Sequence, residues 1–482
     1  MTFKKIEHSS LEERKKMGKR ARDHASPGSH AGWEPAAARP DPVSLLQEQD
    51  ATREPDLVPV RHGRMMVSPF TFYRGAAKIM ASDLNGTPTS GLQVQLCGDA
   101  HLSNFGVFAS PERRLLFDLN DFDETLPGPF EYDVKRMAAS FTIAAQNNGF
   151  SRADAQRATI ASATSYRESM AAFAEMSTMD VWYASLSEQG LMDSIRSFTG
   201  EEAAKSKPKK DVKELRKAEK RSRRAADKAR TRDSLQALSK LGEVVGGKPR
   251  IVSQPPIIVP LREIAGQYGL SPDDVERVIH DQFREYRATL QNDRRHLLER
   301  FEIVDVARKV VGVGSVGTRA FIVLLQGRDE GDPLFLQVKE ATASVLEDHL
   351  PKSAYRQPGE RVVHGQRLMQ AASDIFLGWT KGVQAGRYFY WRQLRDMKGS
   401  ADVESMPPET MAFYARTCGW TLARAHARSG DAVAIASYLG KSDAFDRAIT
   451  DFGERYAEQN DRDFLEFTKA IESGRLSVLE GV

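Results

Sequence analysis

The chain has 482 residues, of which 40% are hydrophobic and 28% are charged, so it can bury a large core and we expect two or three lobes. Its two cysteines, Cys97 and Cys418, exclude a disulfide framework and fit a reducing compartment. The start, MTFKKIEHSS, lacks the apolar segment of a signal peptide, and no apolar run is long enough to span a membrane. We therefore expect a cytoplasmic protein without membrane spans.

Residues 1–55 include SPGSHAGWEPAAARPDP, whose composition predicts a flexible N-terminal arm. The segment GLQVQLCGD then alternates Leu92, Val94 and Leu96, which predicts a strand. FGVF and LLFDL, joined by the turn ASPERR, predict a hairpin.

Acidic and amide side chains flank this hairpin, in CGDAHLSNFG before it and in FDLNDFDE at its end. Asn104 enters the hairpin and Asp121 leaves it, so both side chains can reach one ion. Clustered carboxylates repel one another unless a cation or a reacting proton lies between them. The following segment, FEYDVKRMAASFTIAA, has apolar residues at helical spacing, and we expect Asp133 near its start to be structural.

Carboxylates in this arrangement could also belong to a calcium-binding loop or to a metal-dependent phosphoesterase. A calcium loop beginning at Asp118 is excluded because Asp123 replaces its turn glycine and Pro129 replaces its bidentate glutamate. A metal-dependent phosphoesterase that uses Asp99, His101, Asp121 and Asp123 remains an alternative.

A basic stretch runs from Lys205 to Arg232, with 14 Lys and Arg against 4 Asp and Glu, a net charge of 14 − 4 = +10. It has no aromatic residue that could stack on a base. A solvated helix with Glu–Lys pairs is therefore the favoured interpretation, and nucleic-acid binding is an open alternative.

The segment VVGVGSVGTRAFIVLL contains Gly312, Gly314 and Gly317 in a G-x-G-x-x-G pattern. It lacks the Lys-Ser/Thr pair of a Walker loop, and a β-branched run follows where a dinucleotide-binding fold would begin a helix. A glycine loop between two strands is the arrangement that covers nucleotide phosphates in kinases. We expect Ser315 to contribute to the same loop.

Lys339 follows in the apolar strand LFLQVKEA, where an ammonium group needs an anionic partner. Glu360, at the start of a predicted helix, is one candidate to orient this lysine, and Glu347 is a second. RYFYWRQL and its neighbour DIFLGWTKG predict a strand pair. An adenine ring could then lie against the backbone around Gln393 to Arg395.

GDAHLSN and NDFDE together resemble the catalytic loop and metal-binding motif of aminoglycoside and choline phosphotransferases, within the protein-kinase-like superfamily. From about Pro59 onward the chain also resembles the bacterial domain-of-unknown-function 2252 family, through GRMMVSPFTFYRGAA, KVVGVGSVGTR, QVKEA and AASDIFLGW. The kinase resemblance implies an α+β, two-lobed, protein-kinase-like fold with a mostly helical larger lobe. Because the Asp99 and Asp121 motifs precede the glycine loop, it also implies a circular permutation.

The same resemblance implies an ATP- and Mg²⁺-dependent phosphotransferase that acts on an unknown, small-molecule hydroxyl. Asp99 would accept the hydroxyl proton or orient the hydroxyl, Asn104 and Asp121 would hold Mg²⁺, and Asp123 could share a second ion. Gly312, Gly314, Ser315 and Gly317 would cover the phosphates, and Lys339 would contact them with support from Glu360. A nucleotide-binding regulator without turnover and a nucleotidyltransferase are alternatives. Cys97 stands where the phosphotransferases have a histidine.

The resemblance divides the chain into five parts after the arm: the catalytic hairpin with helices (56–200), a basic helical insertion (201–235), a helical connector (236–300), the nucleotide-binding lobe (301–400) and C-terminal helices (401–482). A shared phosphate site requires the Lys339 ammonium to lie within about 10 Å of the Asp121 carboxylate. The D-F-G at Asp451 is expected to lie outside this cleft on a helix, whereas His426 and Asp431 could still line it without acting as the catalytic pair.

Overall fold

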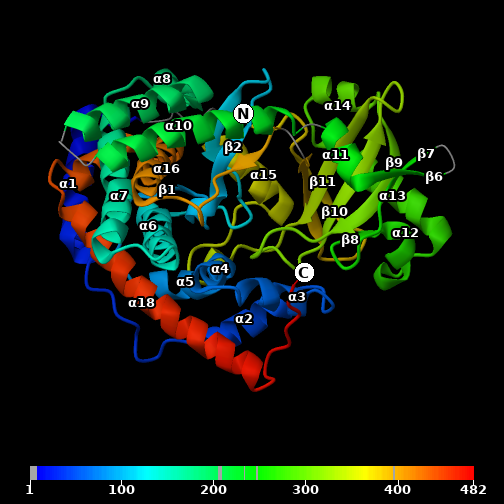
Figure 1. Ribbon diagram of the computed structural model, residues 1–482, viewed down its shortest axis with the longest axis horizontal. Coiled ribbons are helices and arrows are strands. Elements are labelled where there is room, and N and C mark those ends of the chain that lie inside the picture. Colours follow the sequence, from blue (N-terminus) through cyan, green and yellow to red (C-terminus); the bar gives the residue numbers. More distant parts are fainter. Residues whose placement is uncertain (1–7, 205–208, 233, 246–247, 395–396, 482) are drawn as a thin grey trace.

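The computed structural model describes residues 8–204, 209–232, 234–245, 248–394 and 397–481. Its fold is α+β, with a helical part, a sheet part and a layer of short helices that touches both (Figure 1). Within the described residues, no helix has the length and apolarity needed to cross a bilayer.

The sheet part is built on one antiparallel sheet in the order β12-β13-β11-β10-β9-β8. Its strands are β8 (Ile258–Pro260), β9 (Glu302–Lys309), β10 (Ala320–Gln326), β11 (Pro333–Glu340), β12 (Gly378–Lys381) and β13 (Tyr388–Gln393). Around it lie α11 (Ser234–Leu241), the hairpin β6 (Gly242–Val245) and β7 (Lys248–Ile251), α12 (Leu261–Ile264), α13 (Pro272–Ala288) and α14 (Asn292–Leu298). Side chains alternate across a strand, so Val338 packs with α13 on one face while Lys339 points to the other.

The expected helical connector at 236–300 is wrong in part. β8 forms the sixth strand of the main sheet, and β6 pairs with β7. The β-branched run PPIIVP has the composition of a strand, and its residues Ile258 and Val259 are buried.

The helical part contains α6 (Phe130–Asn147), α7 (Arg152–Ala174), α8 (Thr178–Tyr183), α9 (Glu188–Ala204), α10 (Lys209–Arg230), α16 (Pro408–Ser429), α17 (Ala432–Leu439) and α18 (Ala444–Glu472). Two small sheets join it: β1 (Gln93–Leu96) pairs with β4 (Leu126–Pro129), and β14 (Gly399–Ser400), β2 (Phe105–Ala109), β3 (Leu115–Leu119) and β5 (Leu186–Ser187) form the second. The hairpin predicted from FGVF and LLFDL is therefore confirmed as β2–β3. Helix α15 (Pro358–Met369) lies between the helical and sheet parts (Figure 1).

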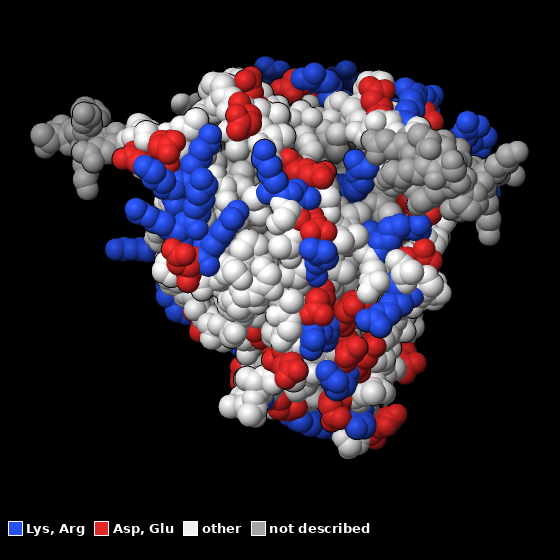
Figure 2. Space-filling model, turned by 90° about the vertical axis from the view of Figure 1, so that its left-hand side faces the viewer, with Lys and Arg blue, Asp and Glu red and all other residues white. Residues whose placement is uncertain are grey.

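Residues 205–208 of the basic stretch lie outside the described residues, and Lys209–Arg230 form the helix α10, as predicted for this stretch. Its residues Ala226 and Ala229 are buried against Leu115 of the hairpin, while Arg223 pairs with Glu219 one turn away at 3.4 Å. On the face in Figure 2, Lys and Arg side chains mix with Asp and Glu side chains, apart from one group of Lys and Arg towards its left edge. Such mixing is typical of a solvated surface.

The expected flexible arm at 1–55 is wrong for its described residues. They form α1 (Leu11–His24), a 3₁₀ turn at Pro27–His30 and α2 (Pro42–Asp50). Arg39 in the intervening segment donates hydrogen bonds to Asp83 and Asp463, with 2.7 Å to Asp83 Oδ1 and 2.6 Å to Asp463 Oδ2. With α3 (Val58–Met65), α4 (Pro69–Gly75) and α5 (Ala77–Asn85), α2 forms a layer beneath both other parts (Figure 1). We call α2 to α5 the N-terminal layer.

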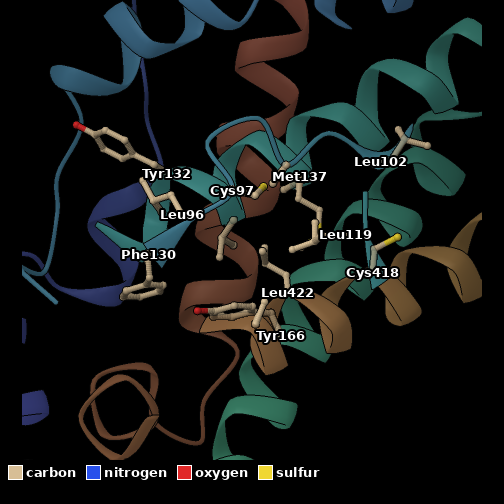
Figure 3. Packing of buried hydrophobic residues seen from close by; sticks show 14 of the residues in the cluster. Leu96, Cys97, Leu102, Leu119, Phe130, Tyr132, Met137, Tyr166, Cys418 and Leu422 are labelled. Atoms are coloured by element: carbon tan, nitrogen blue, oxygen red, sulfur yellow. The ribbon is translucent and has the colours of Figure 1, made fainter. Parts of the chain in front are cut away.

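The core of the helical part lies directly under the loop that follows β1. Leu96, Cys97 and Leu102 from this loop region pack with Met137 of α6 and Leu422 of α16 (Figure 3). Their burial anchors a polar loop on a rigid apolar base.

Candidate active site

The loop between β1 and β2 is held by Asp133, in the first turn of α6. Its carboxylate accepts hydrogen bonds from the amides of Cys97 (2.8 Å) and Gly98 (3.0 Å), and His426 Nε2 lies 3.2 Å from it. Gly98 has φ +83°, and a Cβ there would lie 2.2 Å from the Glu124 carbonyl oxygen, so this turn requires glycine. Asp133 therefore positions the loop, in agreement with its expected structural role.

Asp99 projects from this loop and accepts a hydrogen bond from Arg136 Nε at 2.8 Å. Burial raises the pKa of Asp99, and the charge of Arg136 only partly opposes that shift. A carboxylate with a raised pKa is a stronger base than an exposed aspartate. His101 lies 3.7 Å from Asp99, and burial together with nearby Arg136 and Arg74 holds the pKa of His101 well below its usual range, so it is neutral.

The hairpin brings Asn104 and Asp121 together, as expected. Phe105 pairs with Leu119, and the Asn120 amide donates to the Asn104 carbonyl at 2.8 Å. The Asn104 side chain donates through Nδ2 to the Asp99 carbonyl at 2.7 Å, which leaves its amide oxygen for another partner.

Lys339 lies across from the hairpin, on β11 of the main sheet. Its ammonium nitrogen is 2.5 Å from Asp123 Oδ2, 3.2 Å from Ser315 Oγ and 4.0 Å from Asp121 Oδ2. The predicted upper limit of about 10 Å between Lys339 and Asp121 is therefore met. Asp123 and Lys339 therefore form an ion pair, although they are 216 positions apart in the sequence.

The electrostatics of this pair are those of a buried salt bridge. Burial alone would lower the pKa of Lys339, but Asp121 and Asp123 raise it above its usual range. Burial alone would raise the pKa of Asp123, but the Lys339 charge and a hydrogen bond from Tyr390 Oη, 2.7 Å away, lower it. Both groups are therefore charged at neutral pH.

The glycine loop connects β9 to β10, as predicted, and rests on the N-terminal layer. Arg64 donates to the Gly312 carbonyl at 2.6 Å, Arg53 donates to the Val316 carbonyl, and the Glu54 amide donates to the Gly317 carbonyl at 2.8 Å. A Cβ on Gly314 would lie 2.9 Å from the Arg74 carbonyl oxygen, so the loop tip approaches α4 closely.

The expected orienting glutamates of Lys339 are wrong. Glu360 lies 3.8 Å from His364 on the same helix, and Glu347 lies 3.9 Å from Arg361. The carboxylates within 4.0 Å of Lys339 in the described part of the chain are those of Asp121 and Asp123. The order of motifs in ordinary kinases favours a glutamate after the lysine. Here the carboxylates that contact Lys339 instead come from the end of the hairpin.

Helix α15 acts on the site through Arg361, which the sequence reasoning missed. Its guanidinium donates to the Asp123 carbonyl at 2.7 Å and to the Thr342 carbonyl at 2.9 Å, and it also contacts the Thr125 carbonyl oxygen. Arg136 and Tyr390 were missed as well. The available signal was an arginine or tyrosine within an apolar segment, as in VKRMAA and YFYW.

Many of these groups line one cavity, which we call the cleft; Lys339 and Gly317 are not among its lining residues. Its lining comes from the N-terminal layer, the Asp99 loop, the end of the hairpin, the glycine loop and the end of β11: Gln49, Thr52, Arg53, Arg74, Gly75, Ala77, Asp99, His101, Asn104, Asp121, Asp123, Glu124, Gly312, Val313, Gly314, Ser315, Thr318, Glu340, Ala341 and Thr342.

The remaining predicted residues lie elsewhere. Gln393 donates to Asp374 at 3.0 Å and is not among the residues that line the cleft, and Arg395 lies outside the described residues. Asp451 lies on α18, where it accepts from the Gly32 amide at 2.7 Å, and Asp431 caps α17. Asp451 is absent from the cleft lining, as predicted, and neither Asp431 nor His426 is among the residues that line it.

The donor set of the cleft fits magnesium held jointly with a nucleotide. Within the described ranges, no three His, Cys, Asp or Glu side chains gather in a way that could hold a metal by themselves. Mg²⁺ is usually held by one or two carboxylates with substrate phosphates, and Asp121 with the free amide oxygen of Asn104 supplies such a partial set. Asp123 fits less well, because both of its carboxylate oxygens have protein donors.

Comparison with known proteins identifies the family. The model of the family described as "Uncharacterized protein conserved in bacteria (DUF2252)" matches residues 53–470. The chain belongs to this family. No curated protein and no solved structure matches it. The match begins at Arg53 and so takes in the N-terminal layer from that residue onward, the glycine loop and the Asp99 loop.

Proposed function

We propose that this protein is an ATP- and Mg²⁺-dependent phosphotransferase with a circularly permuted, two-lobed, kinase-like fold. One observation carries the proposal: buried Lys339 pairs with Asp121 and Asp123, and these two carboxylates line a cleft together with Asp99, Asn104 and the tip of the glycine loop. Kinases that transfer a phosphoryl group to a hydroxyl use four such groups: a lysine, a metal-binding carboxylate, an asparagine and a catalytic aspartate.

The glycine loop supports this proposal through its unused amides. Among the described backbone hydrogen bonds, those donated by this loop come from Val316 and Thr318, and the amides of residues 312–315 donate none. Such amides can bind phosphate oxygens. Lys339 would contact the same phosphates. In this structure its ammonium group is paired with Asp123.

Asp99 would receive the proton of the acceptor hydroxyl, and Arg136 would keep its carboxylate in place. Asn104 and Asp121 would hold Mg²⁺, which neutralises charge on the transferred group when bound. Asp133 would keep the loop rigid, so that the distance between base and phosphate is fixed before the substrate enters.

Calorimetric titration with ATP and Mg²⁺, followed by incubation with γ-labelled ATP and a metabolite extract, tests the proposal. We expect ATP binding and a labelled, non-nucleotide product. ATP binding without any label transfer would instead indicate a nucleotide-binding regulator, and release of pyrophosphate would indicate nucleotidyl transfer.

A further inference from the structure

Arg74 lines the cleft without a protein partner. It is the penultimate residue of α4, and its guanidinium lies 5.9 Å from the Phe70 ring centre. In the part of the chain that the structure describes, it makes no hydrogen bond and no ion pair within 4.0 Å, and its Nε atom is buried without an acceptor. A buried N–H group without an acceptor is costly unless a ligand supplies one.

The other arginines at the cleft are engaged with the protein. Arg136 binds Asp99, Arg53 binds the glycine loop, and Arg361 binds the backbone of Asp123. Arg136 already neutralises Asp99 at 2.8 Å, so the charge of Arg74 is not needed for that purpose. Arg74 thus differs from these three because, among the described residues, none of its side-chain donors is engaged with the protein.

Arg74 lies near both the glycine loop and Asp99, the proposed base. Its carbonyl faces the tip of the glycine loop at Gly314, and its charge acts on Asp99 and on His101. Glu404 is the other carboxylate whose charge acts on Arg74. Lys339 and Ser315, which we assign to the phosphates, lie 3.2 Å apart.

We propose that the acceptor is itself an anion, a hydroxyl compound with a phosphate or carboxylate group that Arg74 binds. This inference rests on the proposed phosphotransferase function. In the reaction, the acceptor oxygen bonds to the γ-phosphorus of ATP while its proton passes to Asp99, and the bond from the γ-phosphorus to the β–γ bridging oxygen breaks. ADP leaves with that electron pair. Arginine suits this role because its planar fork binds both oxygens of such a group.

The test separates the acceptor anion from the γ-phosphate by filling the nucleotide site first. The full-length protein is saturated with Mg²⁺ and a non-hydrolysable ATP analogue, and inorganic phosphate or acetate is then titrated by calorimetry. We expect the wild type and Arg74→Lys to bind phosphate, and Arg74→Gln to bind it about tenfold to hundredfold more weakly. The affinity for the ATP analogue should be unchanged in Arg74→Gln.

Arg152→Gln is the matched control, because Arg152 is 81% exposed and outside the cleft, and it should bind phosphate like the wild type. Arg74→Met keeps the aliphatic contact with Phe70, and it replaces Arg74→Gln if circular dichroism shows that the latter is unfolded. Equal phosphate affinity in the wild type and the neutral variants would overturn the inference, and so would a tenfold loss of affinity for the analogue, which would place Arg74 on the nucleotide. If the wild type does not bind the analogue, the proposed function fails, and titration of phosphate into nucleotide-free protein still decides whether Arg74 binds an anion.

Discussion

The chain contains two Asp-Phe motifs that look alike in sequence and lie in different environments. Asp121-Phe122-Asp123 follows β3, and its two carboxylates face Lys339 in the cleft. Asp451-Phe452-Gly453, a literal D-F-G, lies within α18, where Phe452 is buried and Asp451 pairs with Arg455 one turn away at 2.9 Å. A carboxylate acquires its chemistry from the groups that the fold places opposite it. Within the described residues, the first motif faces Lys339 and shares a cleft with Asp99, whereas Asp451 pairs with a surface arginine.

The largest expected difference concerns the base. Asp99→Asn should lower the rate of phosphoryl transfer by about 10²- to 10⁴-fold, because the amide cannot take a proton. Asp431→Asn is the matched change at an aspartate outside the cleft lining, and it should leave the rate unchanged because asparagine also caps a helix. Steady-state assays with γ-labelled ATP measure both. Similar losses of rate in the two variants would contradict the assignment of Asp99 as the base.

The second difference concerns magnesium. Wild-type protein should bind ATP about tenfold or more weakly in excess chelator, since Asp121 and the triphosphate repel each other without the cation. Asp121→Asn should lose this dependence on Mg²⁺, whereas Asp451→Asn should keep it. Calorimetry with and without chelator gives the comparison, and equal ATP affinity of the wild type in both conditions would contradict the magnesium assignment.

The third difference lies on the main sheet. Lys339→Met should weaken ATP binding by about tenfold to hundredfold, the range expected for a lost charged hydrogen bond. Lys381→Met, at the exposed end of β12, should bind ATP like the wild type. Thermal melts of both variants show whether the fold is retained. A Lys339→Met variant that folds and binds ATP normally would make this lysine a structural partner of Asp123 alone.

The smallest difference concerns the residue after each motif. Burial raises the pKa of Glu124 to about 7 from a usual value of 4.5, although Arg361 opposes the shift. Between pH 5 and pH 7 the unfolded chain therefore loses a proton that the folded chain keeps, so the free energy of unfolding falls as pH rises, by about 1 to 3 kcal/mol.

Urea unfolding at pH 5, 6, 7 and 8 measures this effect. Glu124→Gln should reduce the fall, while Glu454→Gln, which removes a surface partner of Arg152, should leave it as in the wild type. An unchanged slope in Glu124→Gln would show that the Glu124 carboxyl does not titrate in this range.

Local patterns in the sequence predicted the local parts of the site. Alternating Leu92, Val94 and Leu96 predict β1, and short apolar runs around a turn predict the hairpin β2–β3. A β-branched run predicts the strand after the glycine loop, and helical spacing places the D-F-G on a helix, here α18. A short apolar strand around Lys339 also predicted that its ammonium needs an anion.

The long-range contacts could not be predicted in the same way. The partner of Lys339 lies 216 positions away, and the N-terminal residues are fixed by polar pairs such as Arg39 with Asp463, 424 positions apart. Such pairs leave no periodic pattern in either segment, so a polar, Pro-rich segment resembles a flexible arm. Sequence order alone favours a nearby glutamate as the partner of Lys339, so the contact with Asp123 could not be predicted from it.

The central claim is that Lys339 and Asp121 bind the same nucleotide. A double-mutant cycle tests it most directly: calorimetry gives the ATP affinity in Mg²⁺ for the wild type, Lys339→Met, Asp121→Asn and the double variant. Groups that share a ligand and lie 4.0 Å apart should be coupled, so the effect of the double change should differ from the sum of the single effects by about 0.5 to 3 kcal/mol. Effects that add within about 0.3 kcal/mol, or single variants that bind ATP like the wild type, would contradict a shared site.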